Sequence, residues 1–430
     1  MKNKIIALGV SASMILSAFP YNALADSTGD LDIGNNVENN IETQDVSAEL
    51  ADERVYYPIE GGFETLNGTK SYTRPIYAPH INDGLDSSGL NAQRFIYYLG
   101  DKPKLALTDV IDKNDYHVRK YANMFFGIKT DNGGKWFEKM DSRISRYVYG
   151  HEEYELKDSS FEGTIKMTFT RSDKLDAMLI KVELPEGLED KFVTATVPQG
   201  GSQGDEPQGG SYSKLEFKPE SSSSAEITLD ETKYGITNNR HDVNGTANIS
   251  MDYSLKDASV YNKGVNRLIS SEYTDKPMIV GTSEGNTQSV IYLMLTTEDS
   301  DNEYYLNYAD NAEELFNEGL EYYKSMSEVT KIDSPNPYLN SAFTSQTMAL
   351  DASWNDPVIC HAPIAFHHSY AGWRTMYSYV TADWKERVKT NVREYIKRQS
   401  SKGRIPAFAD GKDSRYNMGV VLVDELLYYR

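Results

Sequence analysis

The stretch SVIYLMLTTEDSDNEYYLNYADNAEELFNEGL, residues 289–320, contains the change of pattern that decides the fold. In residues 289–296 apolar and polar side chains follow the period of two that is typical of a half-buried strand. From Asn311 onward the apolar residues recur at helical spacing, and Asn311 with Glu314 predicts a capping pair at the start of a helix. The chain therefore changes from β to α structure near residue 309.

Upstream of this change, residues 55–308 have the pattern of an antiparallel β-sandwich. Aromatic and β-branched residues alternate with polar ones in several short runs. These runs are residues 165–169, 178–182, 247–255 and 277–281. Turn residues separate them at short intervals, as in a sandwich. Residues 199–213 are rich in Gly and Gln, and we expect them to form a long surface loop.

Downstream of the change, the sequence predicts helices. We expect a linker helix in residues 309–335 and the first helical hairpins of a larger domain in residues 336–430. Asn336 can cap a helix that has Pro337 in its first position and runs to about Ser353. Further helices are expected over residues 370–380, 384–399 and 417–430. The last one is apolar almost all round and no partner helix follows it, so we expect the sequence to be a fragment of a longer protein.

The N-terminal residues are typical of an exported protein. A short basic start precedes an apolar run, and Ala23 and Ala25 supply a cleavage pattern, so residues 1–25 are predicted to be a signal peptide. Residues 26–54 are acidic and contain few large apolar groups, which predicts a disordered spacer. We therefore expect a secreted, extracellular protein. The apolar run is interrupted and short for a span, so we expect no membrane insertion after signal cleavage.

Length and charge narrow the possible partners. A chain of 430 residues allows two or three domains. Its formal net charge is −20, from 64 acidic and 44 basic residues. Nucleic-acid binders concentrate Lys and Arg on one face to meet the phosphate backbone, so we expect no nucleic-acid partner. The same balance argues against docking on an anionic membrane.

Two long polar loops, residues 351–369 and 400–416, precede the helices expected at 370 and 417. Short connections make successive helices antiparallel, so both loops would lie at the same end of the helical domain. The loops combine aromatic side chains with carboxylates, amides and arginines, which suits a sugar, because ring faces stack on aromatic residues and hydroxyls take polar partners. We expect the substrate contacts to be Trp354, His361, His367, Tyr370, Trp373, Arg374, Arg415 and Asn417.

Three saccharide-related functions are compatible with the sequence. Glycoside hydrolysis requires a proton donor and a second carboxylate. Asp351 and Asp410 are the candidates, although either could instead pair with a neighbouring charge or lie in a solvated turn. A polysaccharide lyase would abstract a proton with groups such as His361, Tyr370 and Arg374. In the third alternative, the β-sandwich binds saccharides without catalysis.

Two other kinds of site are not supported by the residue spacing. The histidines at positions 361, 367 and 368 match neither HxxxH nor HExxH, so no metal site is predicted. The glycines near Gly200 and Gly209 are not followed by Lys and a helix, as a phosphate-binding loop requires. We expect no cofactor.

Several motifs resemble one protein superfamily. NGTKSYTRPIY (residues 67–77), LGDKP (99–103) and SRYVYGHEEYEL (145–156) are similar to an uncharacterised branch of the six-hairpin (α/α)6 glycosidase superfamily, found in secreted bacterial polysaccharide-degrading proteins. The pattern W…HAP…YAGWR…DWKERVK (354–389) resembles the first barrel hairpins of that branch. The resemblance implies a multidomain fold of β then α, in which an antiparallel β-sandwich is followed by the start of an (α/α)6 helical toroid.

The same resemblance implies an activity. It implies a secreted glycoside hydrolase that cleaves a plant or host polysaccharide by carboxylic acid/base catalysis, with an oligo- or polysaccharide as its substrate. In many relatives the catalytic acid lies on a barrel loop beyond the first two hairpins. A chain of 430 residues is therefore expected to lack that acid and could be inactive alone.

Overall fold

The computed structural model describes most of the predicted sandwich and part of the helical region. The described residues are 57–66, 82–85, 92–94, 96–99, 102–109, 119–175, 177–198, 226–229, 233–237, 242–273, 277–296, 301–355, 357–359, 378–380, 382–397 and 399–405. The predicted signal peptide, the acidic spacer, the loop at 199–213 and the helix expected from 417 lie outside them. None of the helices within the described segments is long and apolar enough to cross a membrane.

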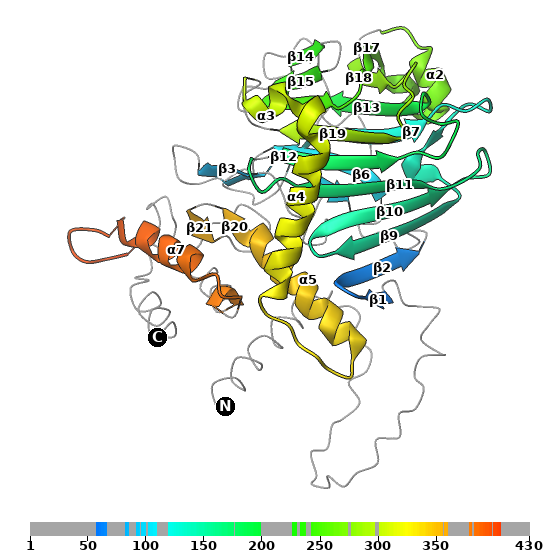
Figure 1. Ribbon diagram of the computed structural model, residues 1–430. Coiled ribbons are helices and arrows are strands. Elements are labelled where there is room, and N and C mark those ends of the chain that lie inside the picture. Colours follow the sequence, from blue (N-terminus) through cyan, green and yellow to red (C-terminus); the bar gives the residue numbers. More distant parts are fainter. Residues whose placement is uncertain are drawn as a thin grey trace, which may run out of the picture.

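Two antiparallel sheets form a sandwich (Figure 1). The described strands of the larger sheet lie in the order β1 (Tyr57–Ile59), β2 (Gly62–Leu66), β9 (Ser142–Val148), β10 (His151–Lys157), β11 (Ile165–Arg171), β12 (Ala177–Glu183), β19 (Val290–Thr296), β16 (Asp242–Ala247), β15 (Lys233–Thr237) and β14 (Glu226–Leu229). The described strands of the second sheet lie in the order β17 (Asp252–Asp257), β18 (Pro277–Thr282), β13 (Phe192–Pro198), β7 (Arg119–Ile128), β6 (Lys102–Asp109) and β5 (Ile96–Leu99), with β8 (Lys135–Trp136) beside β7. The predicted antiparallel β-sandwich is confirmed.

Aromatic rings fill the core between the two sheets. The ring centroids of Phe126 and Phe169, which come from opposite sheets, lie 5.7 Å apart. Phe192 lies 6.3 Å from Phe126, and Tyr154 meets Phe169 edge to face at 5.6 Å. Each such pair contributes roughly 0.5–1.5 kcal/mol beyond the burial of its area. The rings therefore join the sheets at the centre of the sandwich.

The central strand β12 is buried on both faces. Ile180 and Val182 belong to the core between the sheets, as their alternation predicts. Leu179 and Ala177 face the other way and are also fully buried, because helix α4 (Tyr308–Glu328) covers that face. Figure 1 shows α4 running across the strands of the larger sheet. Covering both faces explains why this strand is an almost continuous apolar run.

The prediction of a single strand over residues 247–255 is wrong. The first residue of this run ends β16 in the larger sheet, and its last residues belong to β17 in the second sheet. Between them, the Asn248 side chain accepts a hydrogen bond from the Tyr292 amide at 2.8 Å, and the Asn248 amide donates to the Tyr292 carbonyl at 3.0 Å. An amide side chain that pairs with a neighbouring backbone offers an alternative to the sheet ladder. The chain crosses here from one sheet to the other.

The linker helix is present but begins earlier than predicted. A short helix, α3 (Glu303–Leu306), precedes α4, and α4 itself begins at Tyr308. The predicted capping pair is wrong, because Asn311 lies inside α4, where its Nδ2 donates to the Asn307 carbonyl at 3.2 Å. The buried rings of Tyr305 and Tyr308 pack in the cluster that covers the larger sheet. Because these two rings are packed, the helical structure begins before Asn311, the residue that the sequence pattern marked as the start of the helix.

The next helix agrees with its local signals. Helix α5 (Pro337–Ser353) has the predicted bounds, and the Asn336 side chain accepts a hydrogen bond from the Tyr338 amide at 3.0 Å. It packs against β1 and β2, where the Ser341 hydroxyl donates to the Ile59 carbonyl at 2.9 Å. A short hairpin, β20 (Trp354–Asn355) and β21 (Val358–Ile359), follows α5, and helix α7 (Lys385–Lys397) lies beside β21.

The far face of the second sheet has its own cover. The 3₁₀ helix η4 (Ala258–Lys263) and helix α2 (Val265–Ile269) pack on it, with Phe125 at the centre of the apolar cluster. A buried ion pair lies at its margin, where Lys104 Nζ is 2.8 Å from the Glu138 carboxylate. The Tyr261 hydroxyl donates to the same carboxylate at 2.8 Å. These polar groups satisfy one another, which is what burial requires.

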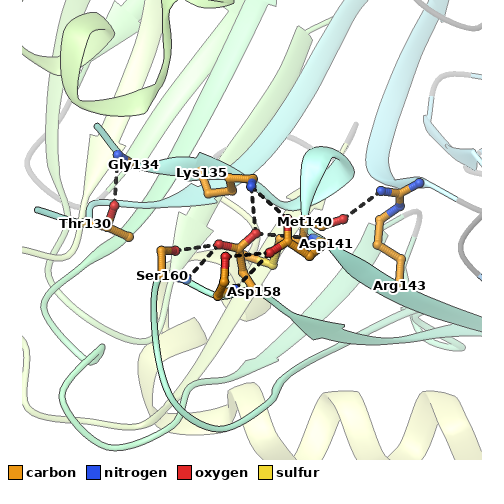
Figure 2. A network of polar contacts seen from close by, with 9 residues as sticks. Thr130, Gly134, Lys135, Met140, Asp141, Arg143, Asp158 and Ser160 are labelled. Carbon is orange, nitrogen blue, oxygen red and sulfur yellow. Dashed lines mark hydrogen bonds and ion pairs between the residues drawn. The ribbon is translucent and has the colours of Figure 1, made fainter. Parts of the chain in front are cut away.

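A polar network joins the turns at the ends of β8, β9 and β10 (Figure 2). The Lys135 ammonium lies 2.8 Å from the Asp158 carboxylate and 3.1 Å from the Asp141 carboxylate. Asp158 also accepts hydrogen bonds from the amide and hydroxyl of Ser160, at 3.0 and 2.7 Å. The corresponding groups of Ser159 donate to Asp141, at 2.9 and 2.8 Å. The network joins β8, the start of β9 and the turn after β10.

Candidate functional site

The structure describes two of the predicted site residues, Asp351 and Trp354, at the end of α5. The others lie outside the described residues: Asp410, His361, His367, Tyr370, Trp373, Arg374, Arg415 and Asn417. Their roles stay predictions. The described part of the site is the end of α5, the β20–β21 hairpin and the start of α7.

Asp351 is buried and paired with two arginines. Its side chain is 3 % exposed and lies in the last turn of α5. Arg387 Nη1, in the first turn of α7, donates to Asp351 Oδ1 at 2.7 Å. Arg171, the last residue of β11, brings its Nη1 to 3.7 Å from Oδ2. The carboxylate therefore joins three segments, and the alternative that Asp351 pairs with neighbouring charges is the one that the geometry favours.

Arg387 connects this carboxylate to two tryptophans. Its Cζ lies 5.5 Å from the ring centroid of Trp354 and 4.8 Å from that of Trp384, within the range of a cation–π contact. Burial opposes the charge of Arg387, but the carboxylate of Asp351 raises the pKa of this guanidinium above its ordinary value. The guanidinium thus holds a permanent charge between one carboxylate and two aromatic rings.

Tyr322 of α4 lies at the margin of this group. Its side chain is 37 % exposed, and its ring meets the ring of Tyr323 edge to face at 5.2 Å. Burial, and after it the negative charge of Asp351, raises the pKa of the Tyr322 hydroxyl. The hydroxyl therefore stays protonated and able to donate a hydrogen bond near neutral pH.

Hydrogen bonds join the hairpin to α7, and the segment before α7 to α5. The Ile359 amide donates to Asn391 Oδ1 of α7 at 2.9 Å, and Asn391 is 2 % exposed. The Tyr379 hydroxyl donates to the Leu350 carbonyl of α5. These segments enclose a small apolar cluster of Leu350, Ile359, Tyr379, Ala382, Val388, Val392, Tyr395 and Ile405.

Arg171, Arg387 and Trp384 were not identified as site residues from the sequence. Trp384 and Arg387 stand three residues apart at the start of a helix, a spacing that brings side chains together, so this pair had a local signal. Arg171 had none, because it lies 180 positions before Asp351 and reaches it only through the packing of α4 and α5 on the sheet.

The arrangement can bind a ligand that has both an apolar face and polar edges. Trp354 is half-buried, and the amide residue Asn355 follows it. Sugars present such a combination of C–H faces and hydroxyls. In the segments that the structure describes, no group of three or more His, Cys, Asp or Glu residues is placed to hold a metal ion.

No protein-family model matches the sequence, and no curated protein matches it. Among solved structures, the chain is similar to a bacterial glucoamylase complexed with acarbose, with 12% identity and a TM-score of 0.48, over 81% of this chain and 56% of that one. A putative kojibiose phosphorylase from the human microbiome has 10% identity and a TM-score of 0.48, over 87% of this chain and 56% of that one.

A further similarity is to a family GH92 inverting mannosidase from Bacteroides thetaiotaomicron, with 9% identity and a TM-score of 0.39, over 87% of this chain and 49% of that one. These three proteins are members of the (α/α)6 glycosidase-like superfamily that the sequence motifs resemble. The chain spans about half the length of the solved structures it matches.

Proposed function

We propose that this chain serves in a secreted, glycoside-active enzyme, in which the end of α5, the β20–β21 hairpin and the start of α7 help to form the saccharide site. The observation that carries the proposal is the position of Trp354. Its half-buried ring follows the buried Asp351 by three residues and lies 5.5 Å from the Arg387 guanidinium. An aromatic face beside fixed polar groups suits a pyranose ring, which has an apolar face and a polar rim.

The proposed reaction is hydrolysis of a plant or host polysaccharide by carboxylic acid/base catalysis. The sequence motifs that resemble the six-hairpin glycosidase superfamily support it, and so does the order of a sandwich followed by helices. Asp351 is better suited to holding the site together than to transferring a proton, because it is 3 % exposed and its Oδ1 accepts a hydrogen bond from Arg387. Asp410 remains the candidate acid in this chain.

Saccharide binding without catalysis is the second candidate. The same position of Asp351 favours it, since a carboxylate that is 3 % exposed and hydrogen-bonded to Arg387 is not accessible to a glycosidic oxygen. In that case Trp354 and its neighbours would bind the glycan, and the chain would retain glycans without cleaving them.

The test uses the full chain with soluble starch, α-mannan and polygalacturonate. Release of reducing ends is measured together with retention of the protein in gels that contain each glycan. We expect retention of the wild type, weaker retention of Trp354→Ala, and loss of any wild-type cleavage in Asp410→Asn. Tyr273→Ala is the matched control, because Tyr273 is an exposed aromatic residue beyond α2, outside the site.

The outcomes separate the candidates. Retention without cleavage would select the binding module, and a product that absorbs in the ultraviolet would select a lyase. Neither cleavage nor retention with any of the three glycans would sink the proposed function for these substrates.

A further inference from the structure

Arg387 is placed to control the orientation of Trp354. Its guanidinium contacts Asp351 of α5, the Trp354 ring of β20 and the Trp384 ring just before α7. The side chain is only 21 % exposed, so little water competes for these contacts. A planar guanidinium can hydrogen-bond at its edge and contact rings with its faces, which an ammonium group cannot do in the same way.

Asp351 is in turn held from the sandwich. Arg171 lies 3.7 Å from its second oxygen, at the end of β11. Helix α4 approaches the backbone of Arg171 closely, since a Cβ added at Gly319 would come within 2.6 Å of the Arg171 carbonyl oxygen. A continuous series of packed contacts therefore leads from the sandwich through Asp351 to Arg387.

The hairpin needs this support at its first residue. Each of its strands has two residues, and a ladder this short has little stability of its own. Its far end is fixed where the Ile359 amide donates to Asn391. At its near end, the contact with Arg387 fixes the Trp354 ring.

We infer that Arg387 is a positioning residue of the saccharide site. Anchored through Asp351, which lies 3.7 Å from Arg171 of the sandwich, its guanidinium contacts the Trp354 indole and sets the orientation in which this half-buried ring meets a saccharide. This inference rests on the proposed function, because the proposed function supplies the saccharide that the Trp354 ring would bind. It also extends the site to a residue of the β-sandwich, Arg171.

The first measurement needs no sugar. Acrylamide quenching of the full chain is recorded for the wild type and Trp354→Phe, and the difference isolates the emission of Trp354. In Arg387→Met we expect quenching of that emission to rise about twofold, because the ring loses the cation that covers it. Arg393→Met is the matched control on the exposed face of α7 and should leave the quenching unchanged.

The second measurement is glycan affinity, with whichever of soluble starch, α-mannan and polygalacturonate the wild type binds. We expect Arg387→Met to bind about fivefold more weakly, Trp354→Phe to lose affinity as well, and the double variant to lose no more than Arg387→Met alone. Arg387→Lys should recover the thermal midpoint, since it keeps the charge opposite Asp351, but not the affinity.

The two measurements distinguish the possible failures. If the wild type binds none of the glycans, the proposed function fails for them, and the quenching alone decides whether Arg387 positions Trp354. If glycans bind but Arg387→Met keeps wild-type quenching and affinity, the positioning role is overturned and the proposed function stands. Full recovery of affinity by Arg387→Lys would also overturn it, because charge pairing alone would then suffice.

Discussion

Asp351 is approached by positive charge from two directions, by Arg387 at 2.7 Å and by Arg171 at 3.7 Å. A carboxylate taken out of water is tolerated only when such partners compensate it. The pairing therefore makes Asp351 a structural centre between the sandwich and α7. It holds together Arg171 of β11 and Arg387 of α7, which belong to different segments of the chain.

Replacing Asp351 with Asn should destabilise the protein. The variant keeps the side-chain shape but leaves Arg387 without its carboxylate, and we expect the free energy of unfolding to fall by about 2–4 kcal/mol. Urea unfolding of the full chain measures this. Combined with Arg387→Met, the second change should add little, because the pair is already broken. Fully additive losses would contradict a direct interaction.

Acid should weaken the network around Asp158. Burial raises the pKa of this carboxyl, but the hydrogen bonds from Lys135 and Ser160 outweigh it and lower the pKa below its ordinary value. A carboxyl with a lowered folded pKa contributes stability that is present above the unfolded pKa of about 3.9 and is lost as the pH falls through the folded value.

Unfolding by urea at several pH values checks this sign. The wild type should lose stability below about pH 4, and Asp158→Asn should be less stable at neutral pH with a shallower decline on acidification. Equal pH dependence of the two proteins would exclude Asp158 from the acid-sensitive set.

Helix α4 and the larger sheet meet at a point where no side chain fits. Gly319 faces the Arg171 carbonyl so closely that a Cβ would come within 2.6 Å of it. In an isolated helix, Gly→Ala stabilises by about 1 kcal/mol. In α4 the contact with the sheet reverses the expected sign.

Gly319→Ala should therefore destabilise the protein, by about 1–3 kcal/mol, because α4 must move away from β11. Asn317→Ala is the matched control, since Asn317 is exposed on the same helix and should gain a few tenths of a kcal/mol from better helix propensity. Thermal unfolding of both variants gives the comparison. A stabilised Gly319→Ala would show that α4 does not press on β11.

Elements were predictable from the sequence where their causes are local. Asn336 followed by Pro337 marked the start of α5, because a cap and a first-turn proline act within a few residues. The crossing at Asn248 was missed, because its partner Tyr292 lies 44 residues away. For the same reason Asp351 and Trp354 could be suggested as site residues, but their link to Arg171 could not.

Across the whole molecule, the buried core passes from the sandwich into the helices. Tyr323 of α4 and Met348 of α5 belong to the same buried cluster as Phe169 of β11. Trp384 packs partly against this cluster and partly against the one around Val388. The boundary predicted between residues 308 and 309 separates strands from helices along the chain, but this core crosses it.

We expect the sandwich to be poorly soluble when it is expressed without its helices. Residues 55–300 lack α4 and would expose the outer face of β12 and β19, including Leu179 and Met294. Residues 55–332 keep α4 and provide the control, since both pieces lack α5. We expect the shorter piece to have the lower soluble yield and to bind a hydrophobic dye more strongly. Equal behaviour of the two would contradict a sheet that depends on α4 for its cover.

The contact between Ser341 and β1 has a consequence for self-association. Among the described strands, β1 stands at the edge of the larger sheet, where unpaired backbone groups could recruit a strand from another molecule. Helix α5 packs over this edge, and the Ser341 hydroxyl donates a hydrogen bond to the Ile59 carbonyl. One serine on a helix thus helps to close this edge of the sheet against intermolecular β-pairing and the fibrous aggregates to which such pairing leads.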